Sequence, residues 1–398
     1  MIDTRIQWLK ELERLSSIVR GYGLSGTQKD SIYVTRQGGQ SIFHDSDAFN
    51  VANSAPHNAI VVDAVDALQG KMPEPAIRAL LGELTYRKTY GAFSEVMAYK
   101  WFGDAGAAFV AQVPLTKLDV VNPNGSTLDG QVTLAGDKIA YFDVKGFGFV
   151  AHKIKLLQER LEAQLPGQSV LIEGDWNVSI DMLQDLLDYN GFSKLLGELQ
   201  VTRRATRGSL EFRAQQQQRV TISGHASDPL SLARENRDYP LRFAGQYARN
   251  KPFLLAFVIH PWFSQGQLHQ NFGGFVDAFT EELSRLAFAS FAKDQTQLLG
   301  MSHAELTRLL SGLVFLNGWP VAGTDAPRPN PSCRIYLNGN AKHKLRVSHF
   351  AKFKKALGDG LVVKQISRSR WSSPLMAAIA LLAIVTIGSI GAYLAFGR

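Results

Sequence analysis

Cysteine is almost absent from this chain of 398 residues, since Cys333 is its only one. A single cysteine excludes an intramolecular disulfide, and it also excludes a zinc site built from several cysteines. The N-terminus lacks the basic start and apolar run of a secretory signal, so we expect no cleaved signal peptide. These absences together suit a protein whose globular part lies in a reducing cytoplasm.

Charged residues are missing from the stretch 374–396 near the C-terminus. Leu375 to Phe396 reads LMAAIALLAIVTIGSIGAYLAF, which at about 1.5 Å per residue is long enough to cross a hydrocarbon core of roughly 30 Å. The sequence therefore predicts a transmembrane helix over 374–396. Within it, Gly388 and Ala392 form a pair of small residues one turn apart, which is compatible with a homo-oligomer.

Basic residues flank the predicted span unequally. Lys364, Arg368 and Arg370 precede it, and Arg398 alone follows it. Because positive charge is retained on the cytoplasmic side, the large N-terminal part is expected in the cytoplasm. This predicts a single-pass C-terminal membrane anchor, and we favour the inner membrane of a bacterium.

Acidic residues are outnumbered, with 35 Asp and Glu against 43 Lys and Arg, so the net charge is +8 and the pI about 9.4. Such a balance favours contact with a polyanion. The segment 342–370 holds nine Lys or Arg and a single acid, Asp359. Because it leads into the predicted span, we favour anionic lipid headgroups as its partner, with nucleic acid as the competing interpretation.

The apolar content of 45% is ordinary for a globular protein, and the length allows two or three domains. An α/β fold is expected, with a mixed sheet between helices. The predicted regions are an N-terminal helix and irregular region over 1–72, a core over 73–180, an α/β extension packed on it over 181–340, a basic juxtamembrane segment over 341–373, and the transmembrane helix over 374–396.

The pattern of the core predicts a definite order of helices and strands. It consists of a helix over 73–102 with a bend near Gly91, strands over 108–113, 127–134 and 139–147, a helix over 152–164, and a strand over 169–173. A short turn joins the second and third strands, which are therefore expected to be antiparallel neighbours. Further along, 252–259 predicts a buried central strand, and 303–314 a helix.

An acid and a base share one face of the third predicted strand. Side chains alternate along a strand, so Asp143 and Lys145 point the same way, while Phe142 and Val144 face the other layer. A charged pair on an otherwise apolar strand suggests a functional site. Asp129 lies in the preceding strand, and Glu95 lies on the first helix.

This arrangement resembles the PD-(D/E)XK nuclease superfamily, which has the restriction-endonuclease-like fold. The matching residues are Glu95, Asp129 and the tripeptide of Asp143, Val144 and Lys145, within about residues 75–177. Leu128 stands where the family motif nominally has proline. The resemblance implies a restriction-endonuclease-like mixed sheet, here elaborated by further strands and helices.

The resemblance also implies a catalytic site of Glu95, Asp129, Asp143 and Lys145. The two aspartates, Glu95 and the carbonyl of Val144 would hold Mg²⁺, with Mn²⁺ as an alternative, because hard cations take oxygen ligands. Lys145 would lie beside the attacking water and stabilise charge that develops on the phosphate. No organic cofactor is expected.

Arginines gather downstream of this region, at Arg203, Arg204, Arg207 and Arg213. They could bind the phosphates of a nucleic acid, or they could form a solvated face of a sheet. The sequence does not decide between the two.

The interpretation with most support is a metal-dependent endonuclease, acting on DNA rather than RNA and held at the cytoplasmic face of a membrane. Defence against phage or other foreign DNA would suit that position. The alternatives are a non-catalytic, membrane-anchored module that binds nucleic acid or assembles with other proteins, and an RNase of the same fold.

Overall fold

The computed structural model describes most of the chain between residues 55 and 366. The described ranges are 55–84, 89–147, 150–176, 178–216, 228–259, 272–317 and 333–366, with short pieces at 10–11, 14, 32–35 and 41–44. Two of these pieces, β1 (Ile32–Thr35) and β2 (Ser41–His44), pair as an antiparallel hairpin.

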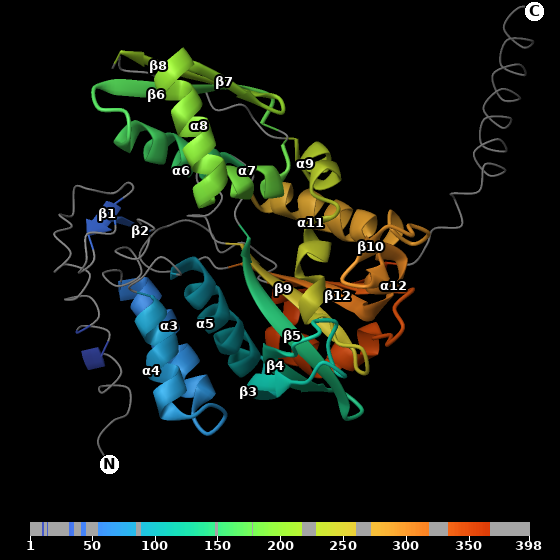
Figure 1. Ribbon diagram of the computed structural model, residues 1–398. Helices are drawn as coiled ribbons and strands as arrows, with labels where there is room; N and C mark the ends of the chain where they lie inside the picture. Colours follow the sequence, from blue (N-terminus) through green and yellow to red (C-terminus); the bar gives the residue numbers. More distant parts are fainter. Residues whose placement is uncertain are drawn as a thin grey trace, which may run out of the picture.

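A seven-stranded mixed sheet forms the centre of the protein (Figure 1). Its strands in spatial order are β14 (Leu361–Ile366), β13 (Cys333–Asn338), β12 (Leu310–Asn317), β9 (Phe253–Ile259), β5 (Lys138–Phe147), β4 (Ser126–Leu134) and β3 (Ala108–Leu115). The neighbours β5, β9 and β12 run parallel, and β13 and β14 run parallel to each other in the opposite direction. The consecutive strands β3, β4 and β5 form an antiparallel meander.

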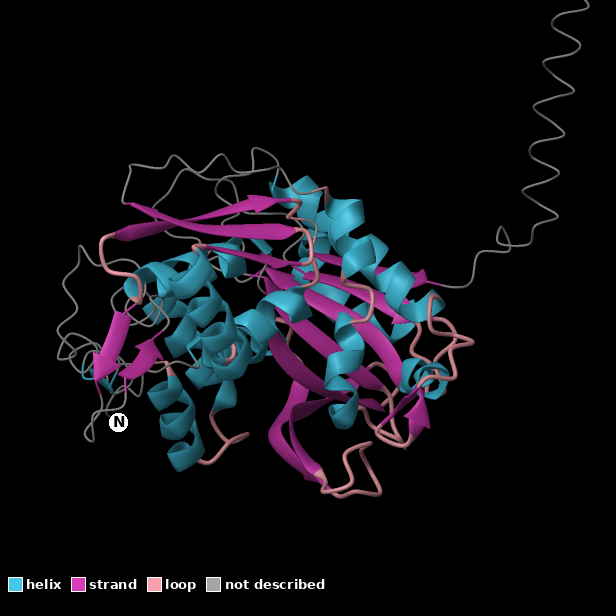
Figure 2. Cartoon of the chain, turned by 45° about the horizontal axis from the view of Figure 1, so that its top comes forward, coloured by secondary structure: helices cyan, strands magenta, loops and turns pink. Residues whose placement is uncertain are grey.

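Helices cover both faces of this sheet (Figure 2). Alternate residues of β5 enter different apolar cores: Phe142 packs with the helices α3 (Ala55–Leu68), α4 (Glu74–Glu83) and α5 (Thr89–Asp104), and Phe147 packs with α11 (Phe272–Ala289). The second core also includes residues of α9 (Pro229–Glu235) and of the 3₁₀-helix η1 (Tyr239–Gln246). The two-residue period of the strand thus produces a three-layer α/β structure.

A second, smaller sheet contains β6 (Gln168–Gly174), β8 (Leu210–Gln216) and β7 (Arg204–Arg207) in that order. The helices α6 (Val150–Ala163), α7 (Ile180–Leu187) and α8 (Tyr189–Thr202) accompany it, as the upper part of Figure 1 shows. The remaining elements are a short hairpin of β10 (Gln297–Leu298) and β11 (Met301–Ser302), followed by α12 (His303–Leu309).

The predicted strands of the core all form, and the second and third are antiparallel neighbours as expected. The strand predicted over 169–173 also forms, as β6, but it belongs to the smaller sheet. The parallel neighbour of β5 is instead β9, whose seven residues are all buried. The prediction of a buried central strand over 252–259 is therefore confirmed, and residues outside 73–180 supply the middle of the sheet.

The helix predicted over 303–314 is wrong in its second half. A capping box at Ser302 and Glu305 starts α12, which ends at Leu309, and the chain continues directly as β12. Residues 310–316 are all buried. A strand covered on both faces has no alternation of polar and apolar residues, so its apolar run cannot be told from a buried helix by periodicity.

The helix predicted over 73–102 is two helices in the structure. Pro73 caps α4, which ends at Glu83, and α5 begins at Thr89 with Gly91 inside it. The region predicted as irregular before residue 72 also contains a helix, α3.

The basic segment predicted to begin at residue 341 is part of the α/β structure as far as Ile366. It contains η3 (Val347–Phe350), α13 (Ala351–Leu357), η4 (Gly358–Gly360) and the edge strand β14. Phe350 and Phe353 are buried in the core, where Phe353 packs against Trp101. Their aromatic rings are thus occupied by the fold.

Within the part of the chain that the structure describes, none of the helices combines the length and apolar character that a membrane crossing requires. The transmembrane helix predicted over 374–396 lies outside the described residues.

Phe257 on β9 provides a test of this architecture. Its ring is fully buried and lies 5.3 Å from the ring of Phe147 and 5.7 Å from that of Phe315, measured between centroids. We expect Phe257→Ala to lower the free energy of unfolding by about 3–5 kcal/mol, because it leaves a cavity between the sheet and its helices. Urea unfolding of the full chain in a neutral detergent measures this. Leu118→Ala, at a side chain 77% exposed, should change the free energy of unfolding by less than about 0.5 kcal/mol. Equal losses of stability in the two variants would contradict a buried position of Phe257 in the middle of the sheet.

Candidate functional site

Glu95 lies on α5, one helical turn before Tyr99. The Tyr99 hydroxyl is 2.8 Å from Glu95 Oε1 and also 2.8 Å from the carbonyl oxygen of Asp129 on β4. Its ring is fully buried and stacks on Phe109 of β3. Tyr99 therefore connects the helix that carries Glu95 to the strand that carries Asp129.

The hairpin of β4 and β5 brings the two aspartates together. Gly130 pairs with Phe142, and the same register continued by one residue places Asp129 opposite Asp143. The backbone N–H of Val144 donates to Asp129 Oδ2 over 2.6 Å. The carboxylate of Asp129 is thus held against the backbone of the tripeptide that begins with Asp143.

Gly130 follows Asp129 at a place where two strands and an aromatic ring meet. A Cβ atom at this position would lie 2.5 Å from the Val110 carbonyl oxygen and 2.5 Å from Phe142 Cζ. The first of these atoms belongs to the backbone and cannot rotate away. Glycine is therefore required here, and its small size allows β4 to approach its neighbours beside Asp129.

Asp143 and Lys145 form an ion pair on β5, with Lys145 Nζ 2.5 Å from Asp143 Oδ2. The Asp143 side chain is only 1% exposed, while that of Lys145 is 23% exposed. Lys145 Nζ also lies over the ring of Phe243 of η1, 5.6 Å from its centroid. The aspartate of the pair is thus buried, and the lysine is partly accessible to solvent.

The three carboxyl groups share one electrostatic environment. Burial is the largest cause that raises the pKa of Glu95, Asp129 and Asp143, and the pKa of Asp129 lies well above its ordinary value. Repulsion from Asp143 and Glu95 raises the pKa of Asp129 further, while the positive charge of Lys145 opposes this. One ammonium group therefore faces three acids, and the site has a deficit of positive charge.

Gln112 is a residue of the site that sequence reasoning missed. It lies on β3 with a backbone φ of 53°, a left-handed conformation that costs free energy for a residue with a Cβ atom. Its Nε2 donates to Glu95 Oε1 over 2.5 Å and lies 3.4 Å from the Tyr99 hydroxyl. Backbone outliers of this kind gather at functional sites. Nothing in the local sequence signals the conformation, since glycine or asparagine would be the usual residue.

The donor set of the site is suited to a hard divalent cation, because it consists of carboxylate oxygens in a buried environment that lacks positive charge. Among the described residues, however, no three His, Cys, Asp or Glu side chains lie close enough to hold a metal ion in their present positions. Asp143 is paired with the ammonium group of Lys145, and Asp129 accepts a hydrogen bond from the backbone N–H of Val144. The oxygen donors of Glu95, Asp129 and Asp143 fit Mg²⁺ by their chemistry, but their present positions do not bring three carboxylates around one point.

The four predicted arginines do not lie on the sheet that carries this site. Arg203 follows α8, and Arg204, Arg207 and Arg213 lie on the smaller sheet. Arg207 pairs with Glu198 over 2.7 Å, and Arg213 pairs with Glu211 over 2.8 Å. Their role in binding nucleic acid stays a prediction.

Asp129 offers a test of the shared electrostatics through the pH dependence of stability. Its pKa is raised in the folded protein, so it favours folding below about pH 4, and this contribution is lost as the pH rises through the folded pKa. We expect Asp129→Asn to raise the melting temperature at about pH 8, and the gain to disappear towards about pH 4. Thermal unfolding from acid to mild alkali measures this. A variant less stable than the wild type at every pH would contradict the predicted repulsion.

Comparison with known proteins identifies no relative of this chain. No protein-family model matches the chain, and no curated protein or solved structure matches it. The argument for a function therefore rests on the geometry and chemistry of the site formed by Glu95, Gln112, Asp129, Asp143 and Lys145.

Proposed function

We propose that this protein is a metal-dependent nuclease that hydrolyses phosphodiester bonds, with DNA as the favoured substrate. The observation that supports it most is the position of Glu95, Asp129, Asp143 and Lys145, which come from a helix and two neighbouring strands and influence one another's charge. A structural ion pair would need one acid for one lysine. Three acids around one lysine suit a site that binds a cation.

Each residue has a task that its position allows. Asp129 and Asp143, together with Glu95 and the carbonyl of Val144, would hold Mg²⁺ or Mn²⁺. When bound, the ion supplies positive charge that stabilises the phosphate oxygens and promotes attack by water. Lys145, which is partly exposed, can hold a phosphate oxygen of the substrate through its Nζ and stabilise the negative charge that develops on it.

Glu95 is held by neighbours that orient its carboxylate. Tyr99 and Gln112 both contact Oε1, so the direction of the carboxyl group is restricted. The raised pKa of Glu95 makes it able to accept a proton at a higher pH than an exposed glutamate can. We propose that Glu95 orients the water that attacks the phosphorus atom.

The setting of this activity is also a proposal. The apolar stretch 374–396 would hold the nuclease at the cytoplasmic face of a membrane, where foreign nucleic acid enters a cell. Defence against phage DNA would use an enzyme in that place.

Substitutions at the site test the activity directly. We expect Asp143→Asn and Lys145→Gln each to reduce Mg²⁺-dependent cleavage of plasmid DNA by about a hundredfold or more, because the first removes a negative charge that would hold Mg²⁺ and the second a positive charge that would stabilise the phosphate. Plasmid, single-stranded DNA and RNA should be offered to the full-length protein in parallel, with and without Mg²⁺. Cleavage of RNA but of neither DNA substrate would show that the enzyme is an RNase rather than the proposed DNase.

A matched control uses an exposed lysine that lies away from the site. Lys117→Gln removes the same charge as Lys145→Gln and should leave the cleavage rate within about twofold of the wild type. Cleavage that persists at the wild-type rate in Asp143→Asn and Lys145→Gln would refute the proposal. Absence of cleavage by the wild type on all three substrates would favour a non-catalytic binding module.

The conformation of Gln112 allows stability and activity to be separated. Gln112→Gly should be more stable than Gln112→Ala, by about 1 kcal/mol, because glycine adopts a φ of 53° without steric cost. Both variants lose the amide that donates to Glu95, so both should cleave DNA at least about tenfold more slowly than the wild type.

Unfolding by urea and initial cleavage rates measure the two effects on the same samples. If Gln112→Gly were fully active, the strained backbone would have no role in positioning Glu95. Equal stability of Gln112→Ala and Gln112→Gly would contradict a left-handed backbone at this position.

A further inference from the structure

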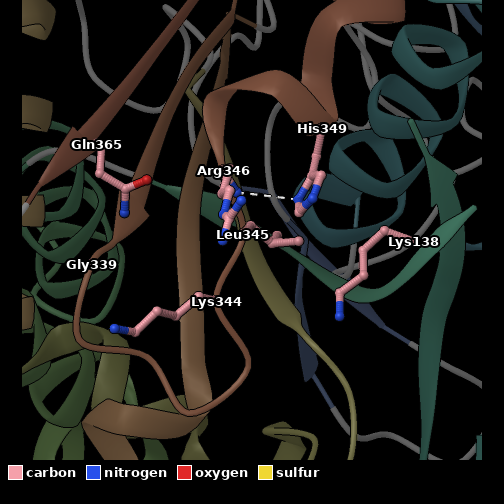
Figure 3. A pocket seen from close by; sticks show the side chains of 7 residues that line it. All are labelled: Lys138, Gly339, Lys344, Leu345, Arg346, His349 and Gln365. Atoms are coloured by element: carbon pink, nitrogen blue, oxygen red, sulfur yellow. Dashed lines mark hydrogen bonds between the residues drawn. The ribbon is translucent and has the colours of Figure 1, made fainter. Parts of the chain in front are cut away.

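A hollow of about 500 Å³ lies at the end of the large sheet where β5 begins. Its walls come from four separate places in the chain, and Figure 3 shows their side chains around a common space. The lining residues are Lys138, Gly339, Lys344, Leu345, Arg346, His349 and Gln365. We call this the basic pocket.

The basic pocket has no acidic residue in its lining. Within the described part of the chain, no carboxylate forms an ion pair with Lys138, Lys344 or Arg346. Lys364 on β14 differs, since it pairs with Glu281 over 2.6 Å. Three cations that line one space, with no carboxylate paired to them among the described residues, create a positive potential that an anion would relieve.

His349 adds a hydrogen-bond donor to the basic pocket. Its Nδ1 accepts from the backbone N–H of Arg346 over 3.2 Å, so a neutral ring carries its proton on Nε2. Burial lowers the pKa of His349, and the charges of Lys138 and Arg346 lower it further. The ring is therefore a natural reporter of any negative charge that enters the pocket.

The basic pocket is distinct from the candidate catalytic site. Lys138 starts β5, and Asp143 lies five residues later on the same strand, which corresponds to about 16 Å. The strands β13 and β14 end beside the start of β5, because they run in the opposite direction. A ligand held by Lys138 and Arg346 would thus not reach Asp143 with the same phosphate.

We propose that the basic pocket binds the phosphate group of a ligand, either the headgroup of an anionic phospholipid or a free phosphate compound. The walls provide ammonium, guanidinium and imidazole donors together with the amide of Gln365, which is a set of groups that complements phosphate oxygens. The volume has room for a phosphate with a small substituent such as glycerol.

The loop that lines the basic pocket is fastened to the fold at two places. Leu345 and Phe350 are buried on either side of Arg346 and His349, and the backbone N–H of Ala135 donates to the His349 carbonyl over 3.0 Å. The loop that carries Arg346 and His349 is therefore attached both to the core and to the β4–β5 hairpin. This attachment reduces the ordering that a ligand would have to impose.

The test follows the ring signals of His349 by NMR in the full-length chain with ¹³C-labelled histidine, assigned with His349→Gln. One arm titrates inorganic phosphate into the protein in a neutral detergent. The other arm compares phosphatidylcholine bicelles with and without phosphatidylglycerol. We expect the pKa of His349 to rise in at least one arm, because a nearby anion stabilises the protonated ring. A rise with inorganic phosphate but not with phosphatidylglycerol identifies a free phosphate compound as the ligand, and a rise with phosphatidylglycerol identifies the lipid headgroup.

Two variants with the same change of charge complete the experiment. Lys138→Gln with Arg346→Gln should weaken the response about tenfold or more. Lys352→Gln with Lys355→Gln, on the exposed face of α13, should change it less than about twofold. The proposal fails if His349 responds in neither arm, if both double variants weaken the response equally, or if a single-stranded oligonucleotide alone produces the response.

Discussion

The electrostatic coupling of three buried carboxyl groups with one another and with one ammonium group is the constraint on which the candidate site depends. Burial raises the pKa of each acid, and their mutual repulsion adds to the effect at Asp129. Packing forces must hold this arrangement together, since its electrostatics oppose it. Two hydrogen-bond donors offset part of the free-energy cost of burying these acids. The Tyr99 hydroxyl contacts Glu95 Oε1 and the carbonyl oxygen of Asp129, and the N–H of Val144 donates to Asp129 Oδ2. A protein that only needed a stable core would replace such a cluster with apolar residues.

Several parts of the fold could be predicted from the sequence because their signals are local. The hairpin of β4 and β5 follows from a short turn between two strand patterns, and β9 follows from its continuous apolar run. The partner of β5 could not be predicted. Both β6 and β9 have strand sequences, and only contacts between residues distant in sequence decide that β9 enters the large sheet. The same continuous burial that identified β9 led to a helix being predicted for β12, because residues 313–316 are all apolar and show no alternation with polar residues.

The candidate site divides in the same way. Asp143 and Lys145 could be identified from strand alternation, and Asp129 from the antiparallel hairpin. Glu95 was assigned from its place on a helix alone, and the Tyr99 hydroxyl is what joins it to Asp129 in the structure. Gln112 had no local signal, because its importance comes from a left-handed backbone and from a contact with a residue 17 positions away. Long-range contacts therefore complete a site of which strand periodicity reveals only half.

The strand β5 carries the beginning of the basic pocket and the centre of the candidate site, so their separation is set by the rigid backbone of a central strand. The spacing of about 16 Å between Lys138 and Asp143 excludes a role for the basic pocket in holding the phosphate that would be cleaved. It is compatible with a second anion that binds separately from the substrate. Since Lys138, Arg346 and His349 are joined through the β4–β5 hairpin, an anion bound there would stabilise the hairpin that places Asp129 opposite Asp143. Ligand binding at one end of the strand would in this way favour the arrangement of acids at its middle.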